Sequence, residues 1–358
     1  MRGKPLRADR WKILLVLVAA LFVPLLFLAW GPSQKGTAQR CPITTSFDMT
    51  FVQPLARDVN RGVTGWGRLF KRLQRMEVSE VVVQWTSLDA FDTYPRKGKT
   101  FSKSALISDL VKAAAAKQAA VWIGLHSETG FWTIADQAPE AIERYFSRRL
   151  EDLEERLPAL LAAIDAPGDA SGQTRNPVAG WYISEEIDDT RWRDPERRAL
   201  LENYLIRTRE ALAAVRPDWP VMISAFANGA QPPAEYGAFL HGLADRAGVG
   251  TILFQDGVGA GKLTAGQAAS YLEALKAGAG KAHLIPIVEL FRIVPDGTIL
   301  PAPLSRIMDQ IDAVAPYASP TLAAFSIPDH MLSSSEPRAT ALHRDWRAMM
   351  ARCAQKDR

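Results

Sequence analysis

The chain has 358 residues, 47% of them hydrophobic, which is enough to bury the core of one large domain or of two small ones. Its formal net charge is only +4, and much of the positive charge lies before an apolar stretch near the N-terminus. The rest of the chain has no basic stripe interleaved with aromatic residues, so the sequence gives no sign of a nucleic-acid partner.

The N-terminal segment predicts export. Five Arg and Lys residues precede an apolar run over residues 13–30, which is about long enough to cross a bilayer. The positive-inside rule keeps the N-terminus in the cytoplasm and places the rest of the chain on the periplasmic side of the inner membrane. Because the run is long for a signal peptide and no clean small-x-small cleavage site follows it, we expect an uncleaved anchor, with a secreted protein as the alternative.

The chain divides into four parts: a basic tip and anchor over residues 1–31, a linker over 32–45, a large domain over 46–353 and a tail over 354–358. Short β-type runs and longer amphipathic segments alternate through the large domain. The expected strands cover residues 46–53, 80–85, 120–125, 178–183, 220–224, 251–255, 283–289 and 322–327. The expected helices cover residues 66–76, 103–117, 139–164, 195–215, 234–247, 264–277, 304–315 and 339–352.

Eight βα units in unbroken alternation predict an α/β fold with a parallel sheet, and eight is the number that closes a single (β/α)8 TIM barrel. A doubly wound open sheet is the alternative fold. Pro286 lies inside the seventh expected strand, where proline is unusual for a central strand.

The stretch over residues 178–189 begins as a short apolar run rich in aromatic residues and ends in four carboxylates, Glu185, Glu186, Asp188 and Asp189. An acidic helix N-terminus would be a purely structural explanation. A solvated acidic loop, however, would mix Lys and Arg among the carboxylates and would lack the flanking Trp and Tyr residues. We therefore interpret this stretch as a strand whose tip forms part of a site.

Polar and aromatic residues also gather at the ends of the other expected strands, which is where a TIM barrel builds its active site. Amide and carboxylate groups bind hydroxyls, and aromatic rings supply flat apolar faces for sugar rings. This composition predicts a polysaccharide or oligosaccharide substrate. We expect the substrate to contact Gln53, Gln84, Trp85, His126, Trp132, Tyr182, Gln255, Asp256, Phe291, Asp329 and His330.

Glycoside hydrolysis needs two carboxylates across the scissile bond. The best pair in this sequence joins Glu185 or Glu186, after the fourth strand, with Glu289, after the seventh. Neighbouring residues of a strand point to opposite sides, so only one of the first two can be the acid. A separation from Glu289 of about 5–5.5 Å would indicate a retaining enzyme, and about 6.5–9.5 Å an inverting one.

The motif Gly180-Trp-Tyr-Ile-Ser-Glu-Glu186, with Glu289 ending a later strand, resembles retaining glycoside hydrolases of the (β/α)8 clan, which place the acid/base after strand four and the nucleophile after strand seven. A closer resemblance is to a bacterial family of glycoside-hydrolase-like barrels classed as a domain of unknown function, of the 4434 type. The residues that carry it are 51–54, 83–85, 180–189 and 254–257. The resemblance implies the fold of most of the exported domain. Two acidic residues after an aromatic strand also resemble the Asp-Glu version of the clan motif, and on this resemblance we favour Glu186 as the acid.

The sequence departs from the clan motif at one position. The Asn that usually precedes the acid is absent, because Ser184 or Glu185 occupies that place, depending on which glutamate is aligned. This departure admits a second function: a barrel that binds glycans without cleaving them and serves a polysaccharide biosynthesis or export system.

The sequence also contains partial signals of a metal site and of a phosphate-binding loop. His126, Asp256 and His330 could serve a metal-dependent hydrolase, but the sequence has no His-x-His pair, and we expect neither a metal nor another cofactor. The motif Gly257-Val-Gly-Ala-Gly-Lys262 is similar to a phosphate-binding loop. It has Leu263 where such a loop needs Ser or Thr, so we do not expect nucleotide binding.

The only two cysteines, Cys41 and Cys353, lie at opposite ends of the expected exported domain. A closed barrel sets its last βα unit beside its first, so the two ends of the domain should meet. Disulfides persist in an oxidising compartment. We therefore predict a disulfide between these two residues.

Overall fold

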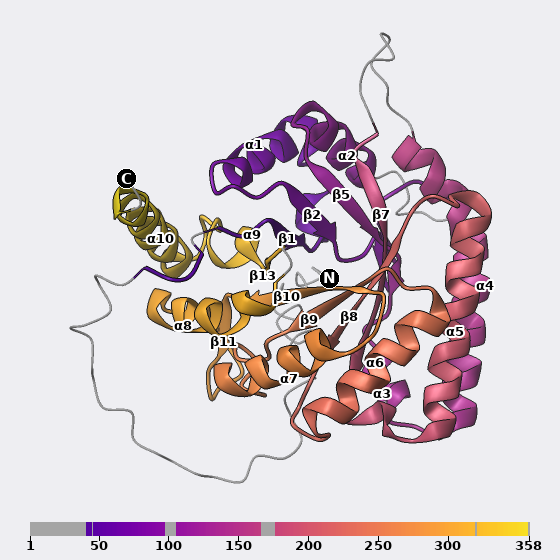
Figure 1. The fold of residues 1–358 in the computed structure, drawn as a ribbon. Helices are drawn as coiled ribbons and strands as arrows, with labels where there is room; N and C mark the ends of the chain where they lie inside the picture. The colour runs from indigo at the N-terminus through magenta and orange to yellow at the C-terminus, as the bar shows by residue number, and fades with distance from the viewer. Residues whose placement is uncertain (1–40, 45, 97–104, 166–175, 319–320, 357–358) are drawn as a thin grey trace, which may run out of the picture.

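The computed structural model describes residues 41–44, 46–96, 105–165, 176–318 and 321–356. Eight parallel strands close a barrel in chain order, which confirms the predicted TIM barrel and excludes the open sheet (Figure 1). All eight predicted strands are present. They are β1 (Met49–Val52), β2 (Glu80–Val83), β5 (Ala120–Gly124), β7 (Val178–Asp188), β8 (Val221–Phe226), β9 (Thr251–Gln255), β10 (His283–Glu289) and β13 (Ala323–Phe325).

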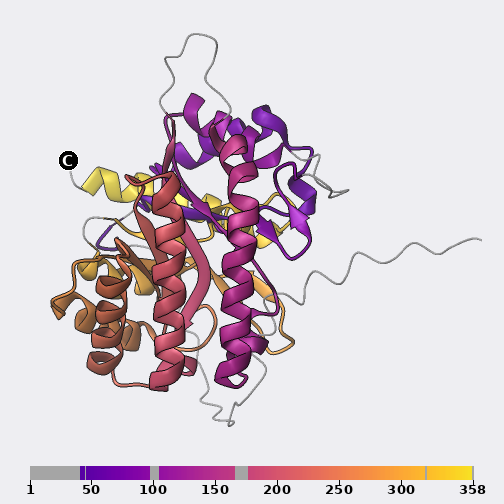
Figure 2. The same cartoon turned by 90° about the vertical axis from the view of Figure 1, so that its right-hand side faces the viewer.

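A long helix follows each barrel strand and packs on the outside of the barrel (Figure 1). Figure 2 shows two of these helices, α4 and α5, running side by side. The last helix continues through Lys356, so the segment expected as a tail from residue 354 begins as helix. The eight helices are α1 (Gly62–Gln74), α2 (Leu106–Ala116), α4 (Pro139–Asp165), α5 (Pro195–Val215), α6 (Pro233–Ala247), α7 (Ala265–Ala277), α8 (Leu304–Val314) and α10 (Pro337–Lys356).

Local sequence sets where several helices begin and end. Asp194 accepts hydrogen bonds from two backbone N–H groups in the first turn of α5, and Pro195 occupies the first helical position. Thr264 and Gln267 form a capping box at the start of α7. Gly248 ends α6 with a φ of 66°, a left-handed conformation that glycine adopts without strain.

Short elements that the sequence analysis did not predict follow the C-terminal ends of the barrel strands. They lie in the loops that carry the site in this fold. They are the small sheet of β3 (Ser87–Leu88), β4 (Phe91–Asp92) and β6 (His126–Ser127), the hairpin of β11 (Phe291–Ile293) and β12 (Ile299–Pro301), and the short helices α3 (Phe131–Ala135) and α9 (Ile327–His330).

Alternation along the strands divides the apolar core in two. Inward-facing side chains fill the barrel, and they are Met49, Phe51, Val82, Tyr182, Met222, Leu253, Ile285, Ile287 and Ala323. Outward-facing side chains, such as Val52 and Val83, pack under the helices in a larger cluster. The barrel interior is therefore solid, and polar groups can gather only at its ends.

Pro286 lies within the central strand β10 because its missing N–H breaks no ladder. The N–H of His283 points to β9, where it donates to the carbonyl of Gly250, so alternation turns the nitrogen of Pro286 towards β13. Pairing of β10 with β13 begins only at Ile287.

The disulfide between Cys41 and Cys353 is present, with a Cα–Cα distance of 5.8 Å. It joins the segment before β1 to α10, and Phe47 stacks on Trp346 of the same helix, with ring centroids 5.3 Å apart. The two ends of the domain therefore meet as expected. The predicted anchor, residues 13–30, lies outside the described residues. Among the helices that are described, none combines the length and apolar character needed to cross a membrane.

Candidate active site

Polar side chains occupy the inward-facing positions just above the apolar barrel interior. Gln53 and Gln84 directly follow β1 and β2, two places after the inward-facing Phe51 and Val82. The Nε2 group of Gln53 donates a hydrogen bond of 2.7 Å to Oε1 of Gln84. Both side chains are half-buried, so this amide pair is accessible from the C-terminal end of the barrel.

Glu186 enters the same layer from β7. The pairing of β7 with β8 shifts register between Ile183 and Ile187, so the strand tip is irregular where the two glutamates stand. Glu186 is half-buried and accepts a hydrogen bond of 2.9 Å from Nε2 of Gln255, at the end of β9. Tyr182 lies deeper in the barrel, fully buried, with its hydroxyl 2.7 Å from that of Ser224.

Glu289 ends β10 and is 3% exposed. Its Oε2 accepts a 2.8 Å hydrogen bond from the backbone N–H of Ala260, in the loop after β9. A Cβ at Gly259 would lie 2.8 Å from the same oxygen, so only glycine lets the loop approach this closely. The loop that is similar to a phosphate-binding loop in sequence therefore holds the carboxylate of Glu289.

The electrostatics of the two glutamates differ. Burial raises the pKa of Glu186; the positive charge of Lys262 and the Gln255 hydrogen bond oppose this, and the negative charges of Glu289 and Asp188 add to it. Burial also raises the pKa of Glu289, against the backbone hydrogen bond from Ala260 and the charge of Lys262. The negative charge of Glu289 thus disfavours the ionised form of Glu186, whereas Glu289 accepts from a backbone N–H that favours its own ionised form.

Lys262 was not among the predicted site residues. Its Nζ lies 3.1 Å from the ring centroid of Phe226, the last residue of β8. Burial lowers the pKa of Lys262, and the charges of Glu186, Glu289 and Asp188 oppose that shift. The signal that could have found this residue was the glycine-rich motif itself.

Aromatic residues flank this group of charges. Trp132, on α3, packs against Phe226 with ring centroids 5.6 Å apart. The guanidinium of Arg191 lies 4.8 Å above the Trp132 ring and forms an ion pair of 2.6 Å with Asp188. Trp132 is half-buried, so it offers an apolar surface beside Lys262.

A second aromatic group lies by β13. Phe291 is buried, 6.2 Å from Phe325 and 5.5 Å from the ring of His330. Burial lowers the pKa of His330 to about 4, so its imidazole is neutral at physiological pH. The carboxylate of Asp329 accepts from the hydroxyl of Ser326 and pairs with Arg57 at 3.1 Å, so its charge is already engaged.

Three other predicted residues point away from the barrel axis. Glu185 is buried and forms an ion pair of 3.0 Å with Arg149 of α4. Trp85 is buried and donates from Nε1 to the carbonyl of Pro54. Asp256 is fully buried and accepts from Nε2 of Gln310 at 2.6 Å, on the side of α8.

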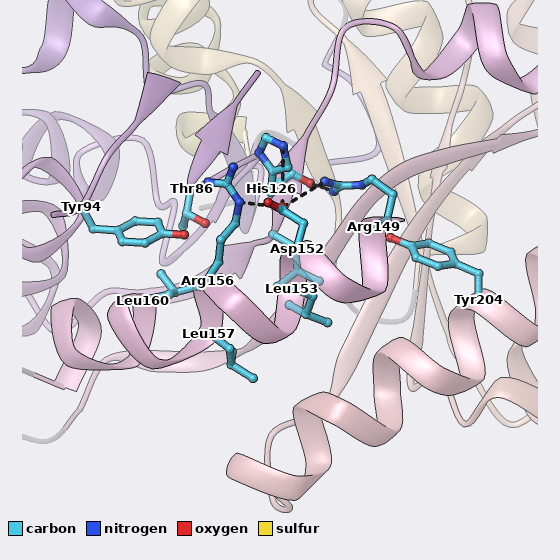
Figure 3. Close-up of a pocket in the computed structure, with 11 residues that line it drawn as sticks. Thr86, Tyr94, His126, Arg149, Asp152, Leu153, Arg156, Leu157, Leu160 and Tyr204 are labelled. Carbon is cyan, nitrogen blue, oxygen red and sulfur yellow. Dashed lines mark hydrogen bonds and ion pairs between the residues drawn. The ribbon is translucent and has the colours of Figure 1, made fainter. Parts of the chain in front are cut away.

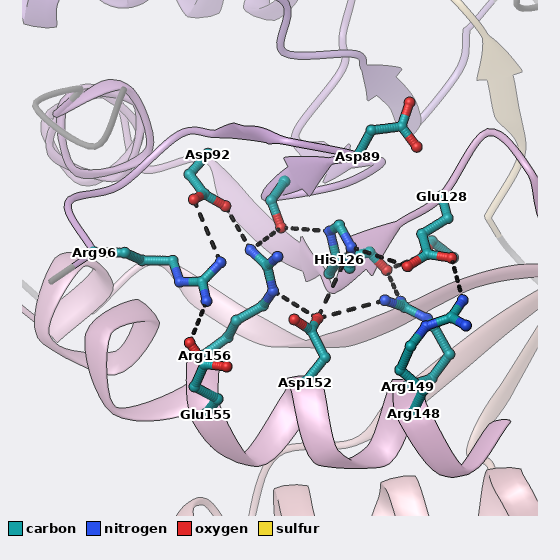
Figure 4. A network of polar contacts seen from close by, with 12 residues as sticks. Asp89, Asp92, Arg96, His126, Glu128, Arg148, Arg149, Asp152, Glu155 and Arg156 are labelled. Carbon is teal, nitrogen blue, oxygen red and sulfur yellow. Dashed lines mark hydrogen bonds and ion pairs between the residues drawn. The ribbon is translucent and has the colours of Figure 1, made fainter. Parts of the chain in front are cut away.

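His126 belongs to a charged network between α4 and the small sheet (Figure 4), and Glu185 joins it through its ion pair with Arg149; we name this network the α4 cluster. Its members are Asp92, Arg96, His126, Glu128, Arg149, Asp152, Arg156 and Glu185. Nδ1 of His126 lies 2.8 Å from the Ser87 hydroxyl, and its Nε2 lies 3.8 Å from carboxylate oxygens of Asp152 and Glu128. These bonds fix His126 in the network.

A cavity lies inside this network, lined by Thr86, His126, Arg149 and Arg156 among others (Figure 3). Its volume of about 10 Å³ is far below the roughly 300–1,000 Å³ of a ligand pocket. It has room for about one water molecule and cannot accept a sugar.

His126, Asp256 and His330 lie in three different surroundings, so they form no common metal site. Across the ranges that the structure describes, no group of three or more His, Cys, Asp or Glu side chains could hold a metal ion.

Comparison with known proteins agrees with this architecture. The chain is 34% identical over 226 residues to the uncharacterized protein YbcH of Escherichia coli K12, a match that covers 62% of this chain and 69% of YbcH. A crystal structure from Bacteroides thetaiotaomicron, provisionally assigned as an α-L-fucosidase, superposes with a TM-score of 0.69 and 18% identity over 91% of this chain and 99% of that one. This likeness shows a shared barrel fold. The family profile of a domain of unknown function, DUF4434, matches residues 47–341. The chain therefore belongs to the DUF4434 family.

Proposed function

We propose that this protein is a glycoside hydrolase that uses Glu186 and Glu289 as its carboxylate pair. The observation that carries the proposal is the position of these two side chains: they come from β7 and β10 and lie at the C-terminal end of the barrel. Glycoside hydrolysis needs such a pair. The neighbouring amides and aromatic rings suit hydroxyl groups and sugar faces.

The surroundings of the two carboxylates divide the roles. Glu289 accepts a backbone N–H and so is the better placed to act as an anion, as nucleophile or base. Glu186, which burial and the charge of Glu289 bias towards the protonated form, donates the proton to the leaving oxygen.

The test is sugar release by the full chain and by the variants Glu186→Gln and Glu289→Gln, after a screen of envelope and extracellular polysaccharides. Each variant should lower kcat by about 10²- to 10⁴-fold. Glu185→Gln is the matched control, because this neighbouring carboxylate pairs with Arg149; we expect loss of stability without a comparable loss of kcat per folded molecule.

Aryl glycosides sharpen the assignment. A substrate with a good leaving group needs little protonation, so Glu186→Gln should lose much less activity on it than on a natural glycan, whereas Glu289→Gln should lose activity on both. Wild-type rates in both glutamine variants would overturn the proposal. Glycan binding without turnover in the wild type would favour the alternative, a binding barrel in a polysaccharide biosynthesis or export system.

We further propose that residues 13–30 anchor the enzyme, so that it acts on the periplasmic side of the inner membrane. The full chain should then fractionate with membranes, and a chain that begins after residue 31 should not. Recovery of the full chain in the soluble fraction at its full length would contradict the anchor.

A further inference from the structure

The ammonium of Lys262 is held inside the site without a direct counter-ion. It lies 3.1 Å above the ring of Phe226 and is half-buried. Within the part of the chain that the structure describes, it has no ion-pair or hydrogen-bond partner. A buried cation without a bonded partner is costly, so its position calls for a functional explanation.

The loop that carries Lys262 also holds Glu289. The backbone N–H of Lys262 donates to the carbonyl of Gly257 at 2.9 Å, and this turn requires the positive φ of 66° at that glycine. Two residues earlier the N–H of Ala260 donates to the carboxylate of Glu289. One rigid loop therefore fixes the position of the cation relative to the anion.

The charged groups that face Lys262 come from three directions. The charges of Glu186 and Asp188 on β7 and of Glu289 on β10 favour its charged form, and the charge of Arg191, beyond the end of β7, opposes it. Asp188 is already paired with Arg191, so the charge of Lys262 remains for the two glutamates.

Building on the proposed function, we propose that Lys262 is the positioning residue of the carboxylate pair: its ammonium, held over Phe226 by the loop that also holds Glu289 and bonded to neither glutamate, offsets their mutual repulsion and sets how the pair holds its proton. Two carboxylates that repel each other titrate as a pair. A nearby positive charge favours their ionised forms, and it acts more strongly in a partly desolvated site. The positive charge of the ammonium opposes the rise in pKa of both glutamates.

The experiment compares wild type, Lys262→Met, Lys262→Gln and Lys262→Arg as full chains. Carbodiimide labels protonated carboxyl groups, so labelling across pH followed by peptide mass spectrometry gives the titration midpoint of each glutamate without any substrate. Fragment spectra separate Glu186 from Glu185. Lys281→Met, a change at an exposed lysine, is the matched control.

Both neutral variants should move the midpoints of Glu186 and Glu289 to higher pH, by about one unit or more, while Lys262→Arg and Lys281→Met keep them near the wild-type values. With a cleaved glycan in hand, the acid limb of the pH profile of kcat should move the same way. Unchanged midpoints in the neutral variants would overturn the role of Lys262. Shifted midpoints without any glycosidase activity would overturn the proposed function and leave the role of Lys262 intact, so the two failures are distinguishable.

Discussion

Two charged regions of this protein stand close together and behave differently. In the α4 cluster every guanidinium has a carboxylate partner: Arg149 pairs with Glu185 and Asp152, and Arg156 pairs with Asp92 and Asp152. At the barrel mouth, the mouth cluster of Gln53, Gln84, Glu186, Gln255, Lys262 and Glu289 contains no such pair among its described members. Its carboxylates accept from neutral amides, and its lysine has no bonded counter-ion.

Charge density alone therefore does not identify a functional site. Ion pairs that close on themselves hold elements together, whereas polar groups left without partners can bind and change protonation state. Glu185 and Glu186 are adjacent in the chain, yet the first belongs to the α4 cluster and the second to the mouth cluster. Their orientation, rather than their residue type, decides their role.

The largest expected effect that separates the two regions is on stability. Arg149→Met should lower the free energy of unfolding by about 3–5 kcal/mol, because it leaves the charge of Glu185 buried without its partner. The double variant with Glu185→Gln should recover part of this loss. Urea denaturation measures both, with Lys262→Met as the comparison from the mouth cluster. A loss in Arg149→Met below about 1 kcal/mol would put the ion pair among weak surface pairs and remove the contrast.

The next effect concerns Asp256, which lies behind the mouth cluster. Burial, with the charge of Glu289, raises its pKa from 3.8 to about 8 in the folded state. Between these values the folded state holds a proton that the unfolded state releases, so the contribution of this carboxyl to stability is complete below pH 4 and is lost by about pH 8.

Asp256→Asn cannot titrate and should not lose this contribution. The free energy of unfolding of the variant should therefore gain relative to that of the wild type as pH rises from 4 to 8, with a slope of up to about 1.4 kcal/mol per pH unit. Urea denaturation at several pH values measures the gain. Parallel pH curves for the two proteins would show that Asp256 is ionised in the folded state across this pH range.

The fold was predictable because its signals are long and regular. The eight barrel strands and the helices after them follow from alternating apolar runs separated by amphipathic segments. The additional strands β3, β4, β6, β11 and β12 have two or three residues each, too few for any period to be read. Pro286 counted against a central strand in the sequence, because a sequence does not show towards which neighbouring strand the missing N–H would point.

The site was predictable in part. Alternation along a strand showed that only one of Glu185 and Glu186 could face the barrel mouth, but the choice of Glu186 came from a resemblance to an Asp-Glu motif. Glu289 ends a strand that the sequence marks clearly. The partner of Glu185 could not be foreseen, because Arg149 lies 36 residues away on a long helix. Lys262 was overlooked because its glycine-rich motif was tested only as a phosphate-binding loop. The same local geometry here holds a carboxylate, which needs backbone N–H groups but no following Ser or Thr.

The smallest expected effect tests whether the neutral amides of the mouth cluster bind ligand or only stabilise the barrel. Gln53 and Gln84 hydrogen-bond to each other, which leaves Oε1 of the first and Nε2 of the second without a partner among the described residues. Both side chains are half-buried, so a sugar hydroxyl can reach them. Gln84→Ala should remove one such bond, about 0.5–1.5 kcal/mol, and raise the KM or Kd for a bound glycan by about 2- to 10-fold. Gln74→Ala, at the far end of α1 where the amide donates to a backbone carbonyl, is the matched control and should leave ligand binding unchanged.

The free energy of unfolding of Gln84→Ala should fall less than the binding free energy does, because its half-buried partner Gln53 can turn to water. If unfolding were affected and binding were not, the amide pair would be structural, like the α4 cluster, and the mouth cluster would reduce to its charged members.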